Sequence, residues 1–295
     1  MQIEKYWVNH MKKSTIAAMI FMLTFCILFT CGCTAPLATQ ETVGQPLETT
    51  IQPISYEDTP VQYSDVNGVT LAYREFGTEN TEPLLMIIGW GGTMDGWNTT
   101  FVGILAENYH VYVYDHRDMG LSTCTDAPLT ISQLSDDAAG LITALEYDSM
   151  QIYGMSMGSM VLQQLLVDHP EVVQKAVLSS ATYDVNLPEM EMSYAQAEEA
   201  IEDPDTPEGV RKEAVAMLEW EGVYDGLSGI TNDVMLITGT ADDVTPQSAA
   251  IEIVDQINGS WFVRFKGIPH AGSCYAPVEY GNIVTVFLEM DESPA

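Results

Sequence analysis

Basic residues are scarce in this chain. Its 295 residues include 10 lysines and arginines against 42 aspartates and glutamates, so the formal net charge at pH 7 is −32. The residues up to Cys33 hold three of those lysines and one glutamate, which leaves a net charge of −34 on the remainder. Nucleic acids and anionic membrane surfaces would repel such a protein, so we expect neither as a partner. The acidity favours either a salt-rich setting, where screening weakens self-repulsion, or simply a soluble secreted protein.

Cysteine is also scarce, with 5 residues in the whole chain. Only Cys124 and Cys274 follow the first 33 residues. His270 and Cys274 have a spacing that two metal ligands could have, but no second cluster of ligands accompanies them, so we expect no metal.

The one extended apolar stretch outside the predicted strands and helices lies near the N-terminus. Lys12 and Lys13 precede it, it runs from Ile16 to Phe29, and small residues and cysteines follow. This pattern resembles a lipoprotein signal peptide over residues 1–33, and the resemblance implies that Cys33 is the lipidated residue, with Cys31 a poorer alternative. An uncleaved N-terminal anchor is the other interpretation, and both place the protein outside the cytoplasm. Residues 34–60 are rich in Thr, Gln, Pro and Glu without periodicity, which predicts a flexible tether.

A five-residue run, Gly154-Met155-Ser156-Met157-Gly158, joins an apolar segment that predicts a strand to an apolar-periodic segment that predicts a helix. A side chain at the apex of such a turn has a strained backbone, and glycines two residues before and after it relieve the crowding. The helix that follows directs free N–H groups at any oxyanion forming there. The pattern predicts that Ser156 is a nucleophile, whereas an ordinary glycine-rich turn with a capping serine is the alternative.

A serine nucleophile needs a base and an orienting acid, which should follow in the order Ser, Asp, His after later strands. Asp242 follows the predicted strand 234–238, and its neighbour Asp243 is the alternative acid. His270 follows the predicted strand 261–265 and is the candidate base. The other four histidines have ordinary explanations: one lies in the leader, one before a strand, one in a loop and one at a helix end, namely His10, His110, His116 and His169.

Strand and helix patterns alternate along the rest of the chain. Two strands over 61–66 and 69–76 are joined by Asn67-Gly68, a strong hairpin signal. Further strands are expected at 84–88, 111–114, 152–153, 176–178, 234–237 and 261–265, with helical stretches between them. We therefore expect an α/β fold with a mostly parallel eight-stranded sheet covered on both faces. The acidic helical segment at about 184–232 is too long for a loop and predicts a small cap.

Taken together, these motifs resemble those of the α/β-hydrolase-fold serine hydrolases, over roughly residues 61 to 290 of a domain predicted to span 61–295. The segment Leu84 to Gly92 resembles that family's strand and oxyanion loop, with Ile88 where a histidine is usual. The resemblance implies that the backbone N–H groups of Trp90 and Met157 form the oxyanion hole.

Two further positions depart from the pattern of this family. The segment Tyr114 to Ser122 resembles the family's Asp-x-Arg-Gly-x-Gly-x-Ser loop, but Asp118 replaces the first glycine, which puts the local turn in doubt. Ser159 replaces a glycine common after the elbow, and a helix tolerates that change. In this fold Cys124 and Cys274 both lie near the active-site edge of the sheet, so we hypothesise a disulfide between them.

The sequence thus predicts a membrane-tethered or secreted, extracytoplasmic serine hydrolase, carboxylesterase-like, that cleaves a small-molecule ester or related acyl substrate without a cofactor. A peptidase, lactonase or perhydrolase would use the same triad, and a non-catalytic binding lipoprotein would keep the same fold. A dehalogenase with an aspartate nucleophile is disfavoured because the apex residue is Ser156. The acyl group, the leaving group and the oligomeric state are not predicted.

Overall fold

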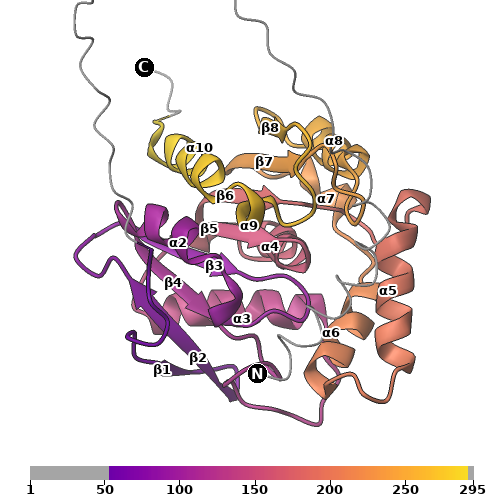
Figure 1. Cartoon of the computed structure of the whole chain (residues 1–295), viewed down its shortest axis with the longest axis horizontal. Helices are drawn as coiled ribbons and strands as arrows, with labels where there is room; N and C mark the ends of the chain where they lie inside the picture. The colour runs from indigo at the N-terminus through magenta and orange to yellow at the C-terminus, as the bar shows by residue number, and fades with distance from the viewer. Residues whose placement is uncertain (1–52, 292–295) are drawn as a thin grey trace, which may run out of the picture. The chain divides into compact units, whose positions relative to one another are not determined.

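An eight-stranded sheet forms the centre of the region that the computed structural model describes, residues 53–291 (Figure 1). The leader, with Cys31 and Cys33, lies outside these residues. In chain order the strands are β1 (Gln62–Val66), β2 (Val69–Phe76), β3 (Pro83–Ile87), β4 (His110–Tyr114), β5 (Met150–Met155), β6 (Val173–Ser179), β7 (Asp233–Gly239) and β8 (Trp261–Phe265). Every strand expected from the sequence is present. Asn67 and Gly68 both have positive φ, 48° and 80°, as the tight hairpin between β1 and β2 requires.

The strands lie in the order β1-β2-β4-β3-β5-β6-β7-β8. The pairs β1–β2 and β2–β4 are antiparallel, and the other neighbours are parallel. The two strands that follow β3 in the chain lie on opposite sides of it in the sheet, β4 on one side and β5 on the other. Loops that leave the carboxyl ends of β3 and β5 therefore begin at the kind of position where open α/β sheets bind ligands.

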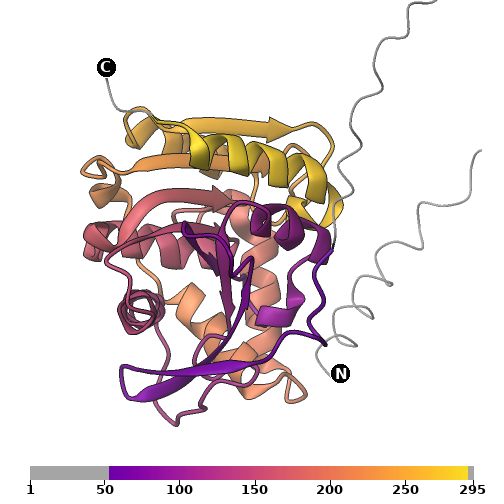
Figure 2. The same cartoon turned by 90° about the vertical axis from the view of Figure 1, so that its left-hand side faces the viewer.

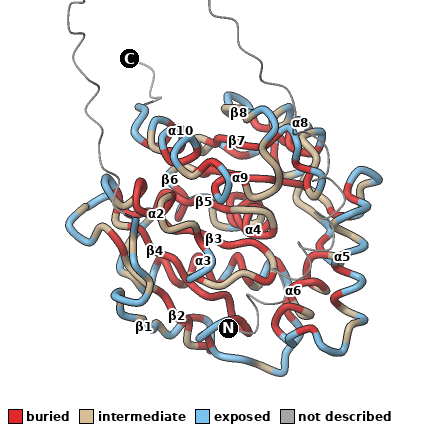
Figure 3. Tube along the Cα trace, in the orientation of Figure 1, coloured by how far each residue is buried: buried red, intermediate tan, exposed pale blue. Residues whose placement is uncertain are grey.

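Helices cover both faces of the sheet (Figure 2). The longer ones are α2 (Thr99–Ala106), α3 (Ile131–Ala144), α4 (Met157–Asp168), α8 (Gln247–Gln256) and α10 (Pro277–Glu289). Side chains of α2 and α10 share one apolar cluster with alternate strand residues, and those of α3, α4 and α8 share the other. In β5, for example, Ile152 belongs to one cluster and its neighbour Tyr153 to the other. Figure 3 shows that the central strands are buried along most of their length. Because successive strand residues point to opposite faces, strands covered on both sides are almost continuously apolar.

The packed domain begins before residue 61, where the sequence placed the end of the flexible tether. The Tyr56 hydroxyl donates to the Trp97 carbonyl over 3.0 Å, and the Ile54 N–H donates to the Thr99 carbonyl over 3.2 Å. The Tyr56 ring also meets Phe76 edge to face. Residues 53–60 therefore belong to the domain, because the Ile54 and Tyr56 side chains also pack against the apolar cluster that contains Phe76 and Trp97.

The segment 184–232, expected to be a cap, is helical and lies between β6 and β7. It contains a short 3₁₀ helix, η4 (Pro188–Met190), and the helices α5 (Glu191–Glu202), α6 (Glu208–Leu218) and α7 (Tyr224–Leu227). α5 and α6 pack against each other at one side of the sheet (Figure 1). Within residues 53–291, no helix has the length and apolarity needed to cross a membrane.

Candidate active site

Ser156 lies at the apex of the turn between β5 and α4. Its backbone has φ 56° and ψ −121°, a conformation that non-glycine residues rarely adopt and that costs about 1–3 kcal/mol. Crowding around this turn explains its glycines: a Cβ on Gly154 would clash with the Gly158 carbonyl, and one on Gly158 with the Ile87 carbonyl of β3. The turn is fixed by the Ser156 N–H, which donates to the Ser179 carbonyl at the end of β6 over 2.9 Å. Local sequence and neighbouring strands together hold the serine in place.

His270 lies in the loop after β8 and reaches this serine. Its Nε2 is 3.0 Å from the Oγ of Ser156, and its Nδ1 is 3.0 Å from each carboxylate oxygen of Asp242. An ionised carboxylate only accepts hydrogen bonds, so the Nδ1 proton belongs on the Asp242 side, which leaves Nε2 to accept the serine proton. The structure thus brings the three sequence-predicted residues together, from loops after β5, β7 and β8.

The carboxylate of Asp242 is buried and held by its own loop. Oδ1 accepts the N–H groups of Val244 (3.2 Å) and Thr245 (2.8 Å), and Oδ2 accepts the Thr245 hydroxyl (2.9 Å). Burial raises the pKa of Asp242, but the hydrogen bond and charge of His270 and the Thr245 N–H outweigh it, so the pKa lies below its ordinary value. Asp243, the alternative acid, is exposed. The carboxylate that is anchored and faces His270 is that of Asp242.

Thr245 is a member of this site that the sequence analysis did not identify. Besides contacting Asp242, its hydroxyl lies 3.2 Å from Nδ1 of His270. Thr245 is buried and lies three residues after Asp242 in the chain. Its hydroxyl and its backbone N–H both point back to the Asp242 carboxylate. That spacing is the signal from which it could have been found, because Asp side chains commonly accept backbone N–H groups two or three residues on.

The loop after β3 lies directly beside Ser156. A Cβ added to Gly89 would be 3.0 Å from the Cβ of Ser156, so a side chain at this position would press on the serine. Trp90 follows, half-buried, with its indole N–H donating to the Val210 carbonyl of α6 over 2.8 Å. Met157 is the first residue of α4 on the other side of the serine. The two residues expected to form the oxyanion hole therefore flank the Ser156 turn, one next in sequence and one in the loop after the neighbouring strand β3.

Ile88, which stands where the resembling family has a histidine, is buried in the apolar cluster beneath the oxyanion loop. The loop is tied instead by carboxylates from elsewhere. Asp115, in the loop after β4, accepts the N–H groups of Met94 and Leu121, each over 2.7 Å. The Gly91 N–H donates to Glu213 of α6, also over 2.7 Å.

Asp118 takes the conformation of the glycine that it replaces. Its φ is 66°, in the left-handed region that aspartate tolerates better than most residues. Its carboxylate compensates by accepting the Thr125 N–H (2.5 Å) and pairing with Lys212 of α6 (3.2 Å). The turn is therefore kept, and α6 contributes to holding it.

The predicted disulfide is wrong, because Cys124 and Cys274 are both free thiols. Cys124 follows Thr123, whose N–H donates to the Thr70 carbonyl of β2. Cys274 follows Ser273, whose hydroxyl lies 3.8 Å from the sulfur of Met155 at the end of β5. β4 and β3 separate β2 from β5, and three strand spacings of about 4.8 Å give roughly 14 Å. A disulfide needs Cα atoms within about 7 Å.

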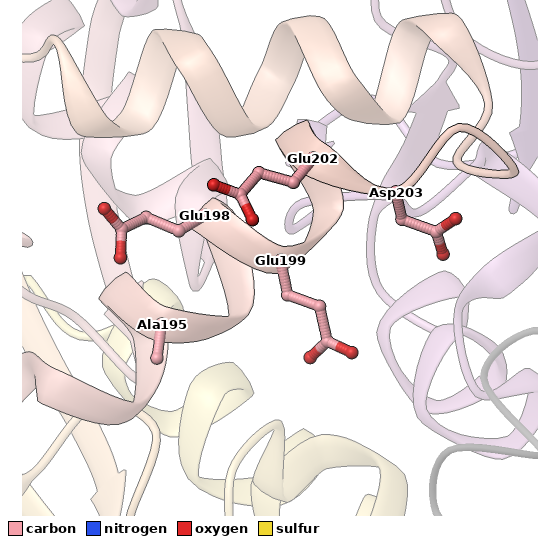
Figure 4. Close-up of a pocket in the computed structure, with 5 residues that line it drawn as sticks. All are labelled: Ala195, Glu198, Glu199, Glu202 and Asp203. Carbon is pink, nitrogen blue, oxygen red and sulfur yellow. The ribbon is translucent and has the colours of Figure 1, made fainter.

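Two surface hollows lie away from this site. One of about 440 Å³ lies along α5 and is lined mainly by carboxylates, at Ala195, Glu198, Glu199, Glu202 and Asp203 (Figure 4). Another, of about 530 Å³, lies between α3 and the segment after α4, and His169 and Asp136 help to line it. Among residues 53–291, no group of three or more His, Cys, Asp or Glu side chains is placed to hold a metal ion.

Comparison with known proteins agrees with this architecture. A family model described as "alpha/beta hydrolase fold" matches residues 82–216, slightly less than half of the chain. Among curated proteins, the rhodomycin D methylesterase DauP of Streptomyces sp. (strain C5) is 31% identical over 132 residues, 43% of this chain and 44% of that protein. The chain thus spans about half the length of the first curated relatives that it matches.

Solved structures resemble more of the chain. The enol-lactonase from Burkholderia xenovorans LB400 has a TM-score of 0.71 at 21% identity, covering 78% of this chain and all of that one. A thermophilic esterase from Thermogutta terrifontis has a TM-score of 0.69 at 18% identity, covering 78% of this chain and 98% of that one. The chain therefore has the α/β-hydrolase fold.

Proposed function

We propose that the chain is a serine hydrolase in which Ser156, His270 and Asp242 act as a catalytic triad on a small ester or related acyl substrate. The observation that carries the proposal is the continuous contact from Ser156 Oγ to His270 Nε2 and from His270 Nδ1 to Asp242, each over 3.0 Å. The strained conformation of Ser156 supports it, because such strain persists only where the surroundings enforce it and is concentrated at functional sites.

In the proposed reaction, Ser156 Oγ attacks the acyl carbonyl carbon while His270 Nε2 takes the hydroxyl proton. The N–H groups of Trp90 and Met157 hold the negative oxygen of the tetrahedral intermediate. The intermediate collapses to an acyl-serine as His270 gives its proton to the leaving alcohol. Water then attacks the acyl-serine with His270 as the base, which releases the acid and restores Ser156. Asp242 keeps the imidazole oriented and stabilises its positive charge in each step.

The substrate class is open within acyl transfer. Among the proteins that the chain resembles, one is named as a methylesterase, one as an enol-lactonase and one as an esterase. These three names point to ester and lactone substrates, whereas a proline iminopeptidase is also similar to part of the chain. The same triad would also serve a peptidase or a perhydrolase, and a binding protein would keep the fold without turnover.

A panel of chromogenic esters of graded acyl length, with lactone and peptide substrates beside them, tests this proposal. Wild-type protein should hydrolyse at least one ester or lactone, and Ser156→Ala should lower kcat by on the order of 10⁵- to 10⁶-fold. Ser248→Ala, a serine-to-alanine change at an exposed position of α8, should leave kcat unchanged. Turnover that survives in Ser156→Ala would remove Ser156 from the chemistry.

The proposed location is outside the cytoplasm, with the chain either anchored through a lipid on Cys33 or secreted. The support is the sequence pattern of residues 12–34, since that part lies outside the described residues. Cys33→Ser should move the protein from the membrane fraction to the soluble fraction, whereas Cys31→Ser should not. An unchanged membrane fraction in Cys33→Ser would favour the uncleaved anchor.

A further inference from the structure

A carboxylate of the cap, Glu213 on α6, is completely buried between two loops of the main domain. Its Oε1 is 2.9 Å from Nδ1 of His116, in the loop after β4, and the side chains of both residues have no exposed surface. Its Oε2 accepts the N–H of Gly91, in the loop after β3, over 2.7 Å. One side chain of the cap therefore joins the two loops that leave neighbouring strands β3 and β4.

A buried carboxylate is unfavourable unless hydrogen bonds replace its lost hydration. Here each oxygen has one donor, and the two donors come from different loops, so Glu213 is satisfied only when α6 is seated on both. The other ring nitrogen of His116, Nε2, is buried and has no hydrogen-bond partner within residues 53–291. His116 is thus available to orient Glu213, and it is not part of the Ser156 contact network.

The N–H that Glu213 fixes is one residue from the proposed oxyanion donor. Gly91 has φ 69°, a left-handed turn immediately after Trp90, and the Gly92 N–H closes this turn onto the Gly89 carbonyl over 3.0 Å. Gly89 in turn abuts Ser156. The direction of the Gly91 N–H sets the orientation of the Trp90–Gly91 peptide, and the short turn transmits that orientation to the Trp90 N–H. On its far side the loop is held separately, by Asp115 at Met94.

We propose that Glu213 is a positioning residue that orients the oxyanion loop through Gly91, so that the Trp90 N–H is aligned with the forming oxyanion. The proposal rests on the proposed serine-hydrolase function. It assigns to α6 a part in transition-state stabilisation. Loss of Glu213 should therefore weaken binding of the tetrahedral state more than binding of the substrate.

The neighbouring residue provides a matched control. Lys212 also joins α6 to the main domain, through Asp118 Oδ2 (3.2 Å) and the Thr125 carbonyl (2.5 Å). These partners belong to the loop after β4 and not to the oxyanion loop. Lys212→Met thus weakens cap docking at the adjacent position without removing the acceptor of the Gly91 N–H.

The experiment compares wild-type protein with Glu213→Leu, Glu213→Gln and Lys212→Met. For each, kcat and KM are measured on the best ester of the panel, together with the inhibition constant of an alkyl boronic acid, which forms a tetrahedral adduct on a reactive serine. Hydrogen exchange of the peptide containing residues 89–94 reports on the loop without reference to catalysis. If Glu213→Leu does not fold, Glu213→Asp replaces it, since the shorter side chain keeps the charge and cannot hold both partners.

We expect Glu213→Leu to lower kcat by about 10- to 100-fold, less than the loss of a whole oxyanion donor, and to change KM by no more than about 3-fold. The boronic acid should bind more weakly by the same factor as kcat falls, and residues 89–94 should exchange faster. Glu213→Gln should recover most of the activity, because its amide oxygen still accepts from Gly91. Lys212→Met should lower thermal stability while kcat stays within about 3-fold of wild type.

Unchanged kcat and boronic acid affinity in Glu213→Leu, with only a lower Tm, would overturn the proposal and leave Glu213 as a structural contact of the cap. An equal kcat loss in Lys212→Met would overturn it too, because cap docking alone would then explain the effect. If the wild-type protein hydrolyses no substrate and takes up no serine-directed label, the proposed function fails. In that case exchange at residues 89–94 still decides whether Glu213 holds the loop, and unchanged exchange would sink that claim as well.

Discussion

The Oγ of Ser156 lies 3.0 Å from Nε2 of His270, although 114 positions separate the two residues in the chain. β5 carries the serine and β8 precedes the histidine, with β6 and β7 between these strands in the sheet. The loop after β8 returns along the sheet edge to β5, and the loop after β7 is paired with it, since the Ala241 N–H donates to the Ile268 carbonyl over 3.0 Å. The sheet edge thus supplies one rigid support for side chains that are distant in sequence.

A methyl group at Gly158 should damage the protein, because it would meet the Ile87 carbonyl, a backbone atom of a central strand. We expect Gly158→Ala to lower the free energy of unfolding by about 1–3 kcal/mol, and to lower kcat as the Ser156 turn shifts. Gly229→Ala is the milder comparison, since its Cβ would lie 3.3 Å from the Gly226 carbonyl oxygen, against 2.1 Å between a Cβ on Gly158 and the Ile87 oxygen. Denaturant unfolding and ester kinetics measure both effects. Equal stability of the two variants would contradict the close approach of α4 to β3.

Removing the hydroxyl of Thr245 should impair catalysis with little change in side-chain volume. Thr245→Val loses the donor to Asp242 Oδ2, while the backbone N–H of residue 245 still holds Oδ1. We expect kcat to fall roughly 10-fold, the effect of losing one hydrogen bond to a charged group. Thr238→Val is the matched control, because the buried hydroxyl of Thr238 makes a 3.5 Å contact within β7. A kcat loss in Thr238→Val as large as in Thr245→Val would show that the effect is not specific to the acid.

The lowered pKa of Asp242 predicts how stability depends on pH. The folded-state pKa lies below the ordinary value of 3.8, so the unfolded chain binds the proton more readily than the folded one. Ionised Asp242 therefore stabilises the fold above pH 3.8, and this contribution is lost as the pH falls through the folded-state pKa. The Tm difference between wild type and Asp242→Asn should shrink between about pH 6 and about pH 3. A difference that grows over this range would contradict the sign of the shift.

The ion pair of Arg117 with Asp137 should contribute strongly to stability. Arg117 donates through Nε (2.5 Å) and Nη2 (2.6 Å) to the two oxygens of Asp137, and both side chains are at least nine-tenths buried. Arg117→Met leaves that carboxylate buried without its partner, so the free energy of unfolding should fall by about 3–5 kcal/mol. Arg264→Met, at an exposed position of β8, should change it by no more than about 0.5 kcal/mol. A similar loss in both variants would refute the special role of the buried pair.

The candidate triad residues and the succession of strands along the chain could be predicted, because a local sequence pattern marks each of them. The crowding at Ser156 requires glycines at fixed distances, and each strand buried on both faces is an apolar run that the chain itself displays. The acid and base follow from their order after β7 and β8. The left-handed turn at Asp118 could not be settled, because whether a non-glycine residue takes that conformation depends on contacts such as the one with Lys212.

The contacts that were missed depend on the strand order and on where the cap sits. Glu213 and His116 meet across 97 positions, and nothing in the sequence around Glu213 distinguishes it from the exposed glutamates of the same segment. The disulfide was wrong for the same reason, since the separation of β2 from β5 follows from the order of strands in the sheet. The packing of residues 53–60 was missed because Tyr56 contacts Phe76 and Trp97, which belong to distant parts of the chain.

Labelling with a fluorophosphonate probe, followed by peptide mass mapping, tests the central claim most directly. Catalysis by Ser156 predicts one phosphonate per chain, located on Ser156, absent in Ser156→Ala and formed far more slowly in His270→Ala. No labelling of the folded wild-type protein, or labelling that persists unchanged in Ser156→Ala, would contradict the account.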